Sequence, residues 1–132
     1  MGEGKITFGA SSQFLKFYTK WEIEEEQAGI IKATQTIEMH GIEEQLINAL
    51  TLSDIQQNSF KIVLESNVAG RTEGKGLRDE RTIAWEFRGE SSFEGFEVYE
   101  RQETGDYFMH AEYGSPEIFR TVIEGLIWLK TP

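Results

Sequence analysis

The sequence predicts a mainly β protein, an antiparallel meander that closes into a barrel. Two observations predict this class. Apolar and polar residues alternate in several runs, most clearly between Thr82 and Tyr113, and short turn-like breaks separate the runs. Successive side chains of a strand point to opposite faces, so each run predicts a strand with one buried face. Such a face must be covered, and closure into a barrel covers it.

The first half of the chain predicts a hairpin followed by a helix. Residues 15–23 and 31–39 alternate in polarity, and Gln27-Ala28-Gly29 between them offers a turn. After Gly41 the period changes, which predicts one short helix at about residues 42–52. The apolar residues on its expected face are Ile42, Leu46, Ile47 and Leu50. Residues 59–67 then return to alternation.

The last segment, residues 116–130, supports two interpretations. Ser115-Pro116-Glu117 is typical of a helix start, whereas Thr121-Val122-Ile123 is a β-branched run and Gly125 would weaken a helix. We expect a final strand. The alternative is an α+β helix-grip fold, in which a C-terminal helix at 116–130 packs against a curved sheet.

The meander also predicts a register. We expect Trp85 opposite Phe96, Ile83 opposite Val98, and Phe96 opposite Tyr113. The expected buried face is Ile83, Trp85, Phe87, Phe96, Val98, Tyr107, Met109, Ala111 and Tyr113. On the opposite face this register places Glu97 across from Glu112, with Arg120 also facing Glu112 and His110 nearby.

Composition narrows the function classes. The chain has 132 residues without a composition break or repeat, so we expect a single domain, residues 1–132. It lacks cysteine, which excludes disulfides and thiolate chemistry. Its formal net charge of −10 repels nucleic acid and anionic membranes. No apolar run is long enough to span a bilayer, and we expect a soluble, cytoplasmic protein.

Candidate chemical motifs are sparse. The glycine-rich segment 70–76 lacks the Ser or Thr that follows Gly-Lys in a phosphate-binding loop, and we expect an exposed hairpin tip or a frayed strand there. Glu97, Glu112 and His110 form a hypothetical metal or acid–base site, but no HExxH-like spacing accompanies them. The sequence therefore assigns no cofactor, no metal ligand and no catalytic residue.

The predicted meander begins with a Trp-bearing strand, Phe17-Tyr-Thr-Lys-Trp21, and ends in one that carries Arg120 and Trp128. In this respect the chain resembles the calycin group, which comprises lipocalins and fatty-acid-binding proteins. Thr19 stands where the Gly-x-Trp motif of lipocalins has its glycine. The resemblance implies a barrel that binds a small apolar ligand inside, with Trp21 and Arg120 pairing to close one barrel end.

Three hypotheses for function follow. The first is non-catalytic binding of a small hydrophobic or amphipathic molecule inside the barrel, because mostly apolar walls with a few polar groups are typical of a ligand pocket. Its candidate ligand-binding residues are Trp21, Gln35, Trp85, Phe96, Met109, Tyr113 and Arg120. The second is a packed, acidic protein–protein interaction domain. The third is a hydrolase or metal-dependent enzyme that uses Glu97, Glu112 and His110.

Overall fold

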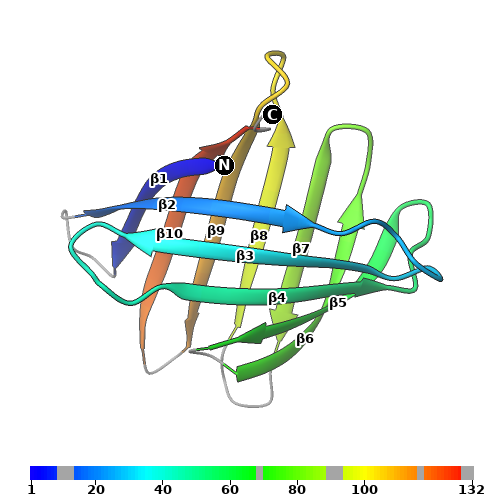
Figure 1. Cartoon of the computed structure of the whole chain (residues 1–132), viewed down its shortest axis with the longest axis horizontal. Coiled ribbons are helices and arrows are strands. Elements are labelled where there is room, and N and C mark those ends of the chain that lie inside the picture. Colours follow the sequence, from blue (N-terminus) through cyan, green and yellow to red (C-terminus); the bar gives the residue numbers. More distant parts are fainter. Residues whose placement is uncertain (9–13, 68–69, 89–93, 116–117, 129–132) are drawn as a thin grey trace.

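The chain folds into a closed antiparallel β-barrel (Figure 1). The computed structural model describes residues 1–8, 14–67, 70–88, 94–115 and 118–128, and within them it contains ten strands. These are β1 (Gly2–Phe8), β2 (Phe14–Ile23), β3 (Ile31–Met39), β4 (Leu46–Ser53), β5 (Ser59–Ser66), β6 (Gly70–Arg78), β7 (Thr82–Arg88), β8 (Glu94–Arg101), β9 (Tyr107–Ser115) and β10 (Ile118–Ile127). Each strand pairs with the next along the chain, and β10 pairs with β1 to close the barrel. The predicted class is confirmed.

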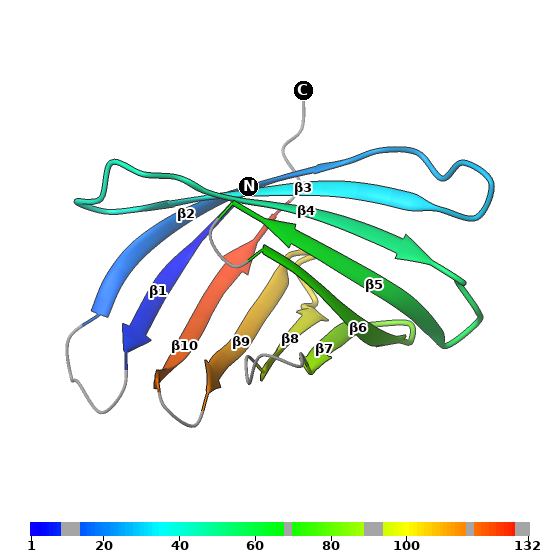
Figure 2. The same cartoon turned by 90° about the horizontal axis from the view of Figure 1, so that it is seen from below.

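The barrel is formed by two groups of strands that face each other. In Figure 1, β2, β3 and β4 run across the front, while β7 to β10 run steeply behind them. Figure 2 shows the two groups as layers with their inner faces toward one another. Because side chains alternate along each strand, one set from every strand points into the space between the layers. The inner faces of both layers therefore build one common core.

The hairpin between β2 and β3 forms as predicted. Trp21 lies opposite Gln35, and Gln27 and Ile30 form a bridge around the turn. Ala28 and Gly29, the two residues of that turn, have φ of 54° and 80°. Two successive positive φ values are typical of the tight turns that match the twist of an antiparallel hairpin.

The predicted short helix at about residues 42–52 is wrong. Leu46–Ser53 is strand β4, and no helix occurs in the described residues. Asn48 explains the error, because its side chain is buried on the inner face between Leu46 and Leu50. A polar residue at an inward position hides the alternation of period two, so the remaining apolar residues mimic helical spacing. The described part of the chain also contains no helix long and apolar enough to cross a membrane.

The final segment is a strand, as expected. Ile118–Ile127 forms β10 and pairs with both β9 and β1, so the alternative C-terminal helix of a helix-grip fold is wrong. The β-branched run Thr121-Val122-Ile123 begins the continuous pairing of β10 with β9, and such residues suit a pleated sheet. Residues 116–117 and 129–130 of the predicted segment lie outside the described residues.

The predicted register of β7, β8 and β9 is shifted by one residue. Trp85 lies opposite Glu97, not Phe96, and Ile83 lies opposite Tyr99, not Val98. Glu97 in turn lies opposite Ala111, and Phe96 lies opposite Glu112. A slip of one residue exchanges the two faces of a strand, so Glu97 and Tyr99 point inward and Phe96 and Val98 point outward. The prediction failed because it reserved the inner face of β8 for apolar residues.

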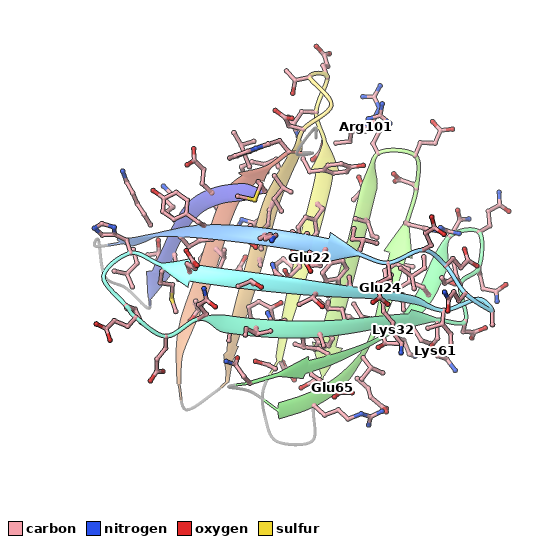
Figure 3. All side chains as sticks on the ribbon, in the orientation of Figure 1. Glu22, Glu24, Lys32, Lys61, Glu65 and Arg101 are labelled. Carbon is pink, nitrogen blue, oxygen red and sulfur yellow. The ribbon has the colours of Figure 1, made fainter. Side chains whose placement is uncertain are left out.

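Charged residues occupy the outer face of the strands. Lys61 and Glu65 flank the buried residues Ile62 and Leu64 on β5, and both are exposed on the outside of the barrel, as is Lys32 on β3 (Figure 3). Nζ of Lys61 lies 3.8 Å from Oδ2 of Asp54, and both side chains are largely solvent-exposed. Exposed pairs of this kind contribute about 0–1 kcal/mol, so the outer charges serve solubility more than stability.

The glycine-rich segment 70–76 is part of a paired strand. Within β6, Gly76 lies opposite Phe60 of β5 and Trp85 of β7. A Cβ added at Gly76 would overlap the ring of Phe60, which is itself buried. The missing side chain therefore lets an aromatic ring of β5 lie across β6. Only Gly76 of the segment is buried, and the segment as a whole is a largely exposed, paired strand and not a hairpin tip.

We predict that Gly76→Ala destabilises the barrel by about 1–3 kcal/mol, because overpacking forces the Phe60 ring out of its position. The free energy of unfolding in urea would measure the change. Phe60→Leu is the matched test, since a smaller side chain leaves room for the new methyl group. The penalty of Gly76→Ala should shrink in the Phe60→Leu background. Equal penalties in both backgrounds would contradict the steric explanation.

Candidate functional site

Polar side chains lie inside the barrel among apolar ones. In the described part of the chain the buried polar residues are Thr19 on β2, Gln35 on β3, Asn48 on β4 and Glu97 on β8. Gln35 is 1 % exposed and Glu97 is 5 % exposed. Burying a polar group costs free energy unless it is hydrogen-bonded, and burying a charge costs more. The partners of these side chains therefore decide what the interior can bind.

Three protein groups bind the carboxyl group of Glu97. The indole Nε1 of Trp85 donates to Oε2 at 3.0 Å, and the hydroxyl of Tyr99 donates to Oε1 at 2.6 Å. The hydroxyl of Tyr113 also donates to Oε2. The register brings these groups together, because Trp85 lies directly opposite Glu97 on β7 and Tyr99 follows it on the same face of β8.

Gly95 makes room for the third donor. Tyr113 of β9 lies opposite Gly95, two residues before Glu97 on the same face of β8. A Cβ at Gly95 would overlap the Tyr113 ring, so the absence of a side chain lets the ring lie flat over β8. From there its hydroxyl reaches Glu97. The local sequence Gly95-Phe96-Glu97 thus supplies both the carboxyl group and the space for one of its donors.

Burial and hydrogen bonding act on the carboxyl group in opposite directions. Burial raises the pKa of Glu97 above its ordinary value of 4.5, and the hydrogen bonds from Tyr113, Tyr99 and Trp85 oppose the rise. Burial and the negative charge of Glu97 raise the pKa of Tyr99 and of Tyr113 well above 10.0. Both phenols therefore remain protonated near neutral pH and stay available as donors.

Aromatic rings join this group to the opposite layer. Trp21 of β2 packs edge-on against Trp85, with ring centroids 6.3 Å apart, and against Tyr99 at 5.9 Å. The rings of Trp85 and Tyr99 are 5.0 Å apart. Edge-to-face pairs of this separation are favourable beyond the area that they bury. The three rings form a wall between the carboxyl group of Glu97 and the inner face of β2.

A second polar group lies on β2, β3 and β4. Nδ2 of Asn48 donates to Oε1 of Gln35 at 3.1 Å. Within the described residues, three further buried polar atoms have no hydrogen-bond partner: Oγ1 of Thr19, Nε1 of Trp21 and Nε2 of Gln35. The amide of Gln35 lies close enough to Tyr99 to oppose the rise in the pKa of its phenol. The two side chains nevertheless form no hydrogen bond of ordinary geometry, and Nε2 of Gln35 has no partner among the described residues. These atoms leave unused hydrogen-bonding capacity inside the barrel.

The structure brings most, but not all, of the sequence-predicted ligand-binding residues to the interior. Gln35, Trp85 and Met109 are buried there, and Trp21 and Tyr113 are partly buried against the same core. Phe96 lies on the outer face of β8, where its ring is 6.0 Å from that of His110. Arg120 belongs to β10, and its side chain lies outside the described part of the structure, as does its predicted pairing with Trp21.

Sequence reasoning missed four residues of the interior: Thr19, Asn48, Glu97 and Tyr99. A signal for two of them was present. Glu97 and Tyr99 are two residues apart and therefore share a face, and a register shifted by one residue places both opposite the predicted inward residues Ile83 and Trp85. That register buries the carboxyl group of Glu97 in the core, which a pattern of apolar inward residues does not predict.

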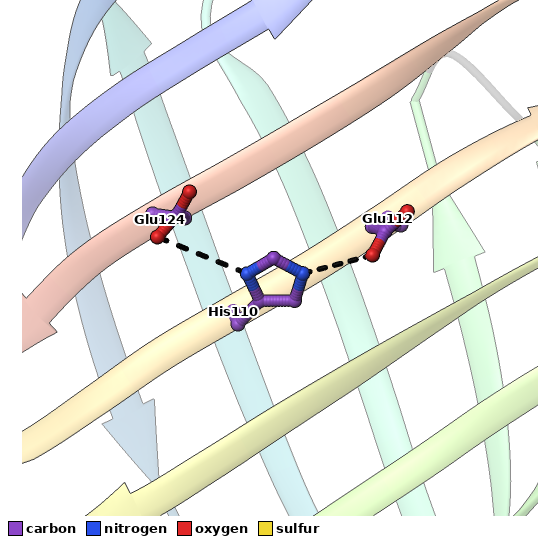
Figure 4. Close-up of polar contacts among 3 residues, drawn as sticks. All are labelled: His110, Glu112 and Glu124. Carbon is purple, nitrogen blue, oxygen red and sulfur yellow. Dashed lines mark hydrogen bonds and ion pairs between the residues drawn. The ribbon is translucent and has the colours of Figure 1, made fainter.

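The hypothetical acid–base group does not assemble. His110 and Glu112 lie on the outer face of β9, with Nε2 of His110 2.9 Å from Oε2 of Glu112 and Nδ1 3.9 Å from Oε2 of Glu124 on β10 (Figure 4). Glu97 points to the inner face, and Val122, not Arg120, lies opposite Glu112 on β10. The described residues contain no group of three or more His, Asp or Glu able to hold a metal ion.

A groove of about 460 Å³ lies on the outside of the barrel, where β1 meets β2 and β10. Its lining includes the outward-facing Lys16 and Tyr18 of β2, Phe108 of β9 and Leu126 of β10. Tyr18 is 49 % exposed and Leu126 is 48 % exposed. This groove is separated from the polar interior by the sheet itself, so ligands at the two places can be told apart by substitution.

Fold and site together define the class of this protein: a closed antiparallel β-barrel with a hydrogen-bonded carboxyl group and unpartnered polar atoms inside. The barrel agrees with the architecture that the calycin resemblance implies. No protein-family model matches the chain, and neither does any curated protein sequence.

We predict that Glu97→Gln changes how stability depends on pH. The raised pKa means that native Glu97 binds its proton more tightly than unfolded Glu97, so the wild type loses stability as the pH rises from about 4.5 through the native pKa. Glu97→Gln lacks this loss. Thermal unfolding from pH 4 to 8 should show the melting temperature of the variant rising relative to wild type. Glu100→Gln, an exposed change on the same strand, is the control, and parallel curves for Glu97→Gln would contradict the prediction.

We also predict that Tyr99→Phe lowers the free energy of unfolding by about 1–3 kcal/mol at pH 7, because Oε1 of Glu97 loses the hydroxyl that donates to it while the ring contacts remain. Urea unfolding would measure the loss. Tyr18→Phe removes the same atom from a tyrosine that is half exposed on the outer face, and should change stability by less than about 0.5 kcal/mol. Equal effects of the two substitutions would argue against the hydrogen bond.

Proposed function

We propose that this barrel binds a small hydrophobic or amphipathic molecule in its interior without chemical conversion, as the calycin resemblance implies. The observation that carries the proposal is that Thr19, Trp21 and Gln35 each have a buried polar atom without a partner among the described residues, in a core that is mostly apolar and aromatic. Buried polar groups are nearly always hydrogen-bonded in native proteins. A polar group of a bound molecule would satisfy these atoms, and the surrounding apolar side chains would bind its hydrophobic part.

The arrangement around Glu97 supports binding more than catalysis. A general base must be within hydrogen-bond reach of a proton on the substrate. Here Trp85, Tyr99 and Tyr113 already donate to the two carboxyl oxygens, which favours a structural carboxyl group. His110 lies on the outer face, away from this group. The described part of the interior therefore offers apolar walls and hydrogen-bond donors to a ligand, and the residues described there include no assembled proton-transfer pair.

The test uses tryptophan emission to locate the ligand. Trp21 and Trp85 belong to the core, whereas Trp128 is 37 % exposed, so Trp128→Phe leaves emission from the interior indoles. We predict that octan-2-one, an eight-carbon amphipathic probe, shifts or quenches this emission saturably. Native mass spectrometry of the same sample should show a stoichiometric complex, and a denaturing run should release the probe.

Binding in the outer groove must be excluded separately. Tyr18→Ser combined with Leu126→Ser removes exposed apolar side chains from that groove and leaves the inner faces of β2 and β10 unchanged. The affinity should stay the same in this variant. A loss of binding there would place the probe outside the barrel, and an absence of any complex across a panel of lipids and cofactors would favour the packed, acidic interaction domain instead.

A further inference from the structure

We propose that the polar group of the ligand is an uncharged hydrogen-bond acceptor, such as the carbonyl of a ketone, ester or amide, bound by Thr19, Trp21 and Gln35. The proposal rests on the proposed function and specifies its ligand. It predicts that a free fatty acid or an aliphatic amine of the same chain length binds more weakly.

The three atoms lie on one patch of the inner surface. Trp21 and Gln35 are directly opposite each other on β2 and β3, and Thr19 is the next inward residue of β2. Thr19 is 2 % exposed and Gln35 is 1 % exposed, and all three polar atoms are shielded from solvent. A single polar group of a ligand at this patch is therefore adjacent to all three side chains.

The patch is rich in donors. An indole Nε1 only donates, and Thr19 can donate or accept. Gln35 has one acceptor and one donor end, and its acceptor Oε1 already receives the hydrogen bond from Asn48. The end that remains is the NH₂ group. Two of the three unpartnered atoms are thus obligate donors, and the complementary ligand group is an acceptor.

The charges of the interior favour an uncharged acceptor. No lysine, arginine or histidine is buried in the part of the chain that the structure describes, so nothing there would pair with a carboxylate ligand. Glu97 lies behind Trp85 and Tyr99, the two rings that Trp21 contacts, so a carboxylate ligand would place a second acidic group in the same core. An ammonium group would present donors to donors and would also lose its hydration.

The experiment compares four probes of equal chain length: octan-2-one, octanoate, octylamine and octane. Affinities are measured by tryptophan emission in the Trp128→Phe protein and confirmed by native mass spectrometry. Octan-2-one should bind most tightly. Trp21→Phe keeps an aromatic ring but removes the N–H. This substitution should weaken the binding of octan-2-one about threefold to tenfold, the equivalent of one hydrogen bond, and should leave the affinity for octane unchanged.

Thr19→Val and Gln35→Met provide independent variants of nearly unchanged shape, and Tyr18→Phe on the outer face is the matched control. Melting temperatures establish that each variant is folded. Tighter binding of octanoate or octylamine than of octan-2-one, or equal losses for octan-2-one and octane in all three interior variants, would overturn the inference while leaving the proposed function intact. Failure of all four probes to bind would overturn the proposed function, and the inference with it.

Discussion

The carboxyl group of Glu97 inside the barrel is the constraint on which the arrangement of β7, β8 and β9 depends. Its three donors come from these three neighbouring strands, Trp85 from β7, Tyr99 from β8 itself and Tyr113 from β9. A slip of one residue in β8 would expose the carboxyl group to solvent and leave the donors without their acceptor, in addition to exchanging the apolar faces. The buried acid costs stability through desolvation, and it specifies the register in return.

The aromatic rings extend this constraint across the interior. Trp21 belongs to β2 in one layer and contacts Trp85 and Tyr99 of the other. The rings that orient the carboxyl group on one side therefore also hold the indole that presents an unpartnered N–H on the other. The same rings contact both Trp21, which belongs to the β2–β3 patch, and the carboxyl group of Glu97. Ligand binding at the patch and a change in the ionisation of Glu97 would therefore both affect Trp85 and Tyr99.

Pattern reasoning predicted the strands whose alternation of polarity is clear in the sequence. The alternation of residues 15–23, 31–39 and 59–67 identified strands, and the β-branched residues near Thr121 identified the last one. The predicted helix and the shifted register arose at Asn48 and Glu97, which are polar residues at inward positions. The same side chains form the candidate site, so the polar interior was the part that the sequence concealed. Gln35 and Trp85 were identified because polarity alternates along their strands. The outward position of Phe96 follows from the pairing of β8 with β7 and β9, which the sequence alone does not show.

The seam between β1 and β10 differs from every other strand pair of the described barrel, because its partners come from opposite ends of the chain. The amino group of Met1 donates to the carbonyl of Trp128, 127 positions away, whereas the other pairs join consecutive strands. Closing so long a loop carries the largest entropic cost of any pairing in the barrel. We therefore expect the hairpins between consecutive strands to form first and the seam, which joins the most distant strands of the described chain, to close last. Separation of this seam would open the barrel between β1 and β10 and expose the enclosed core to solvent.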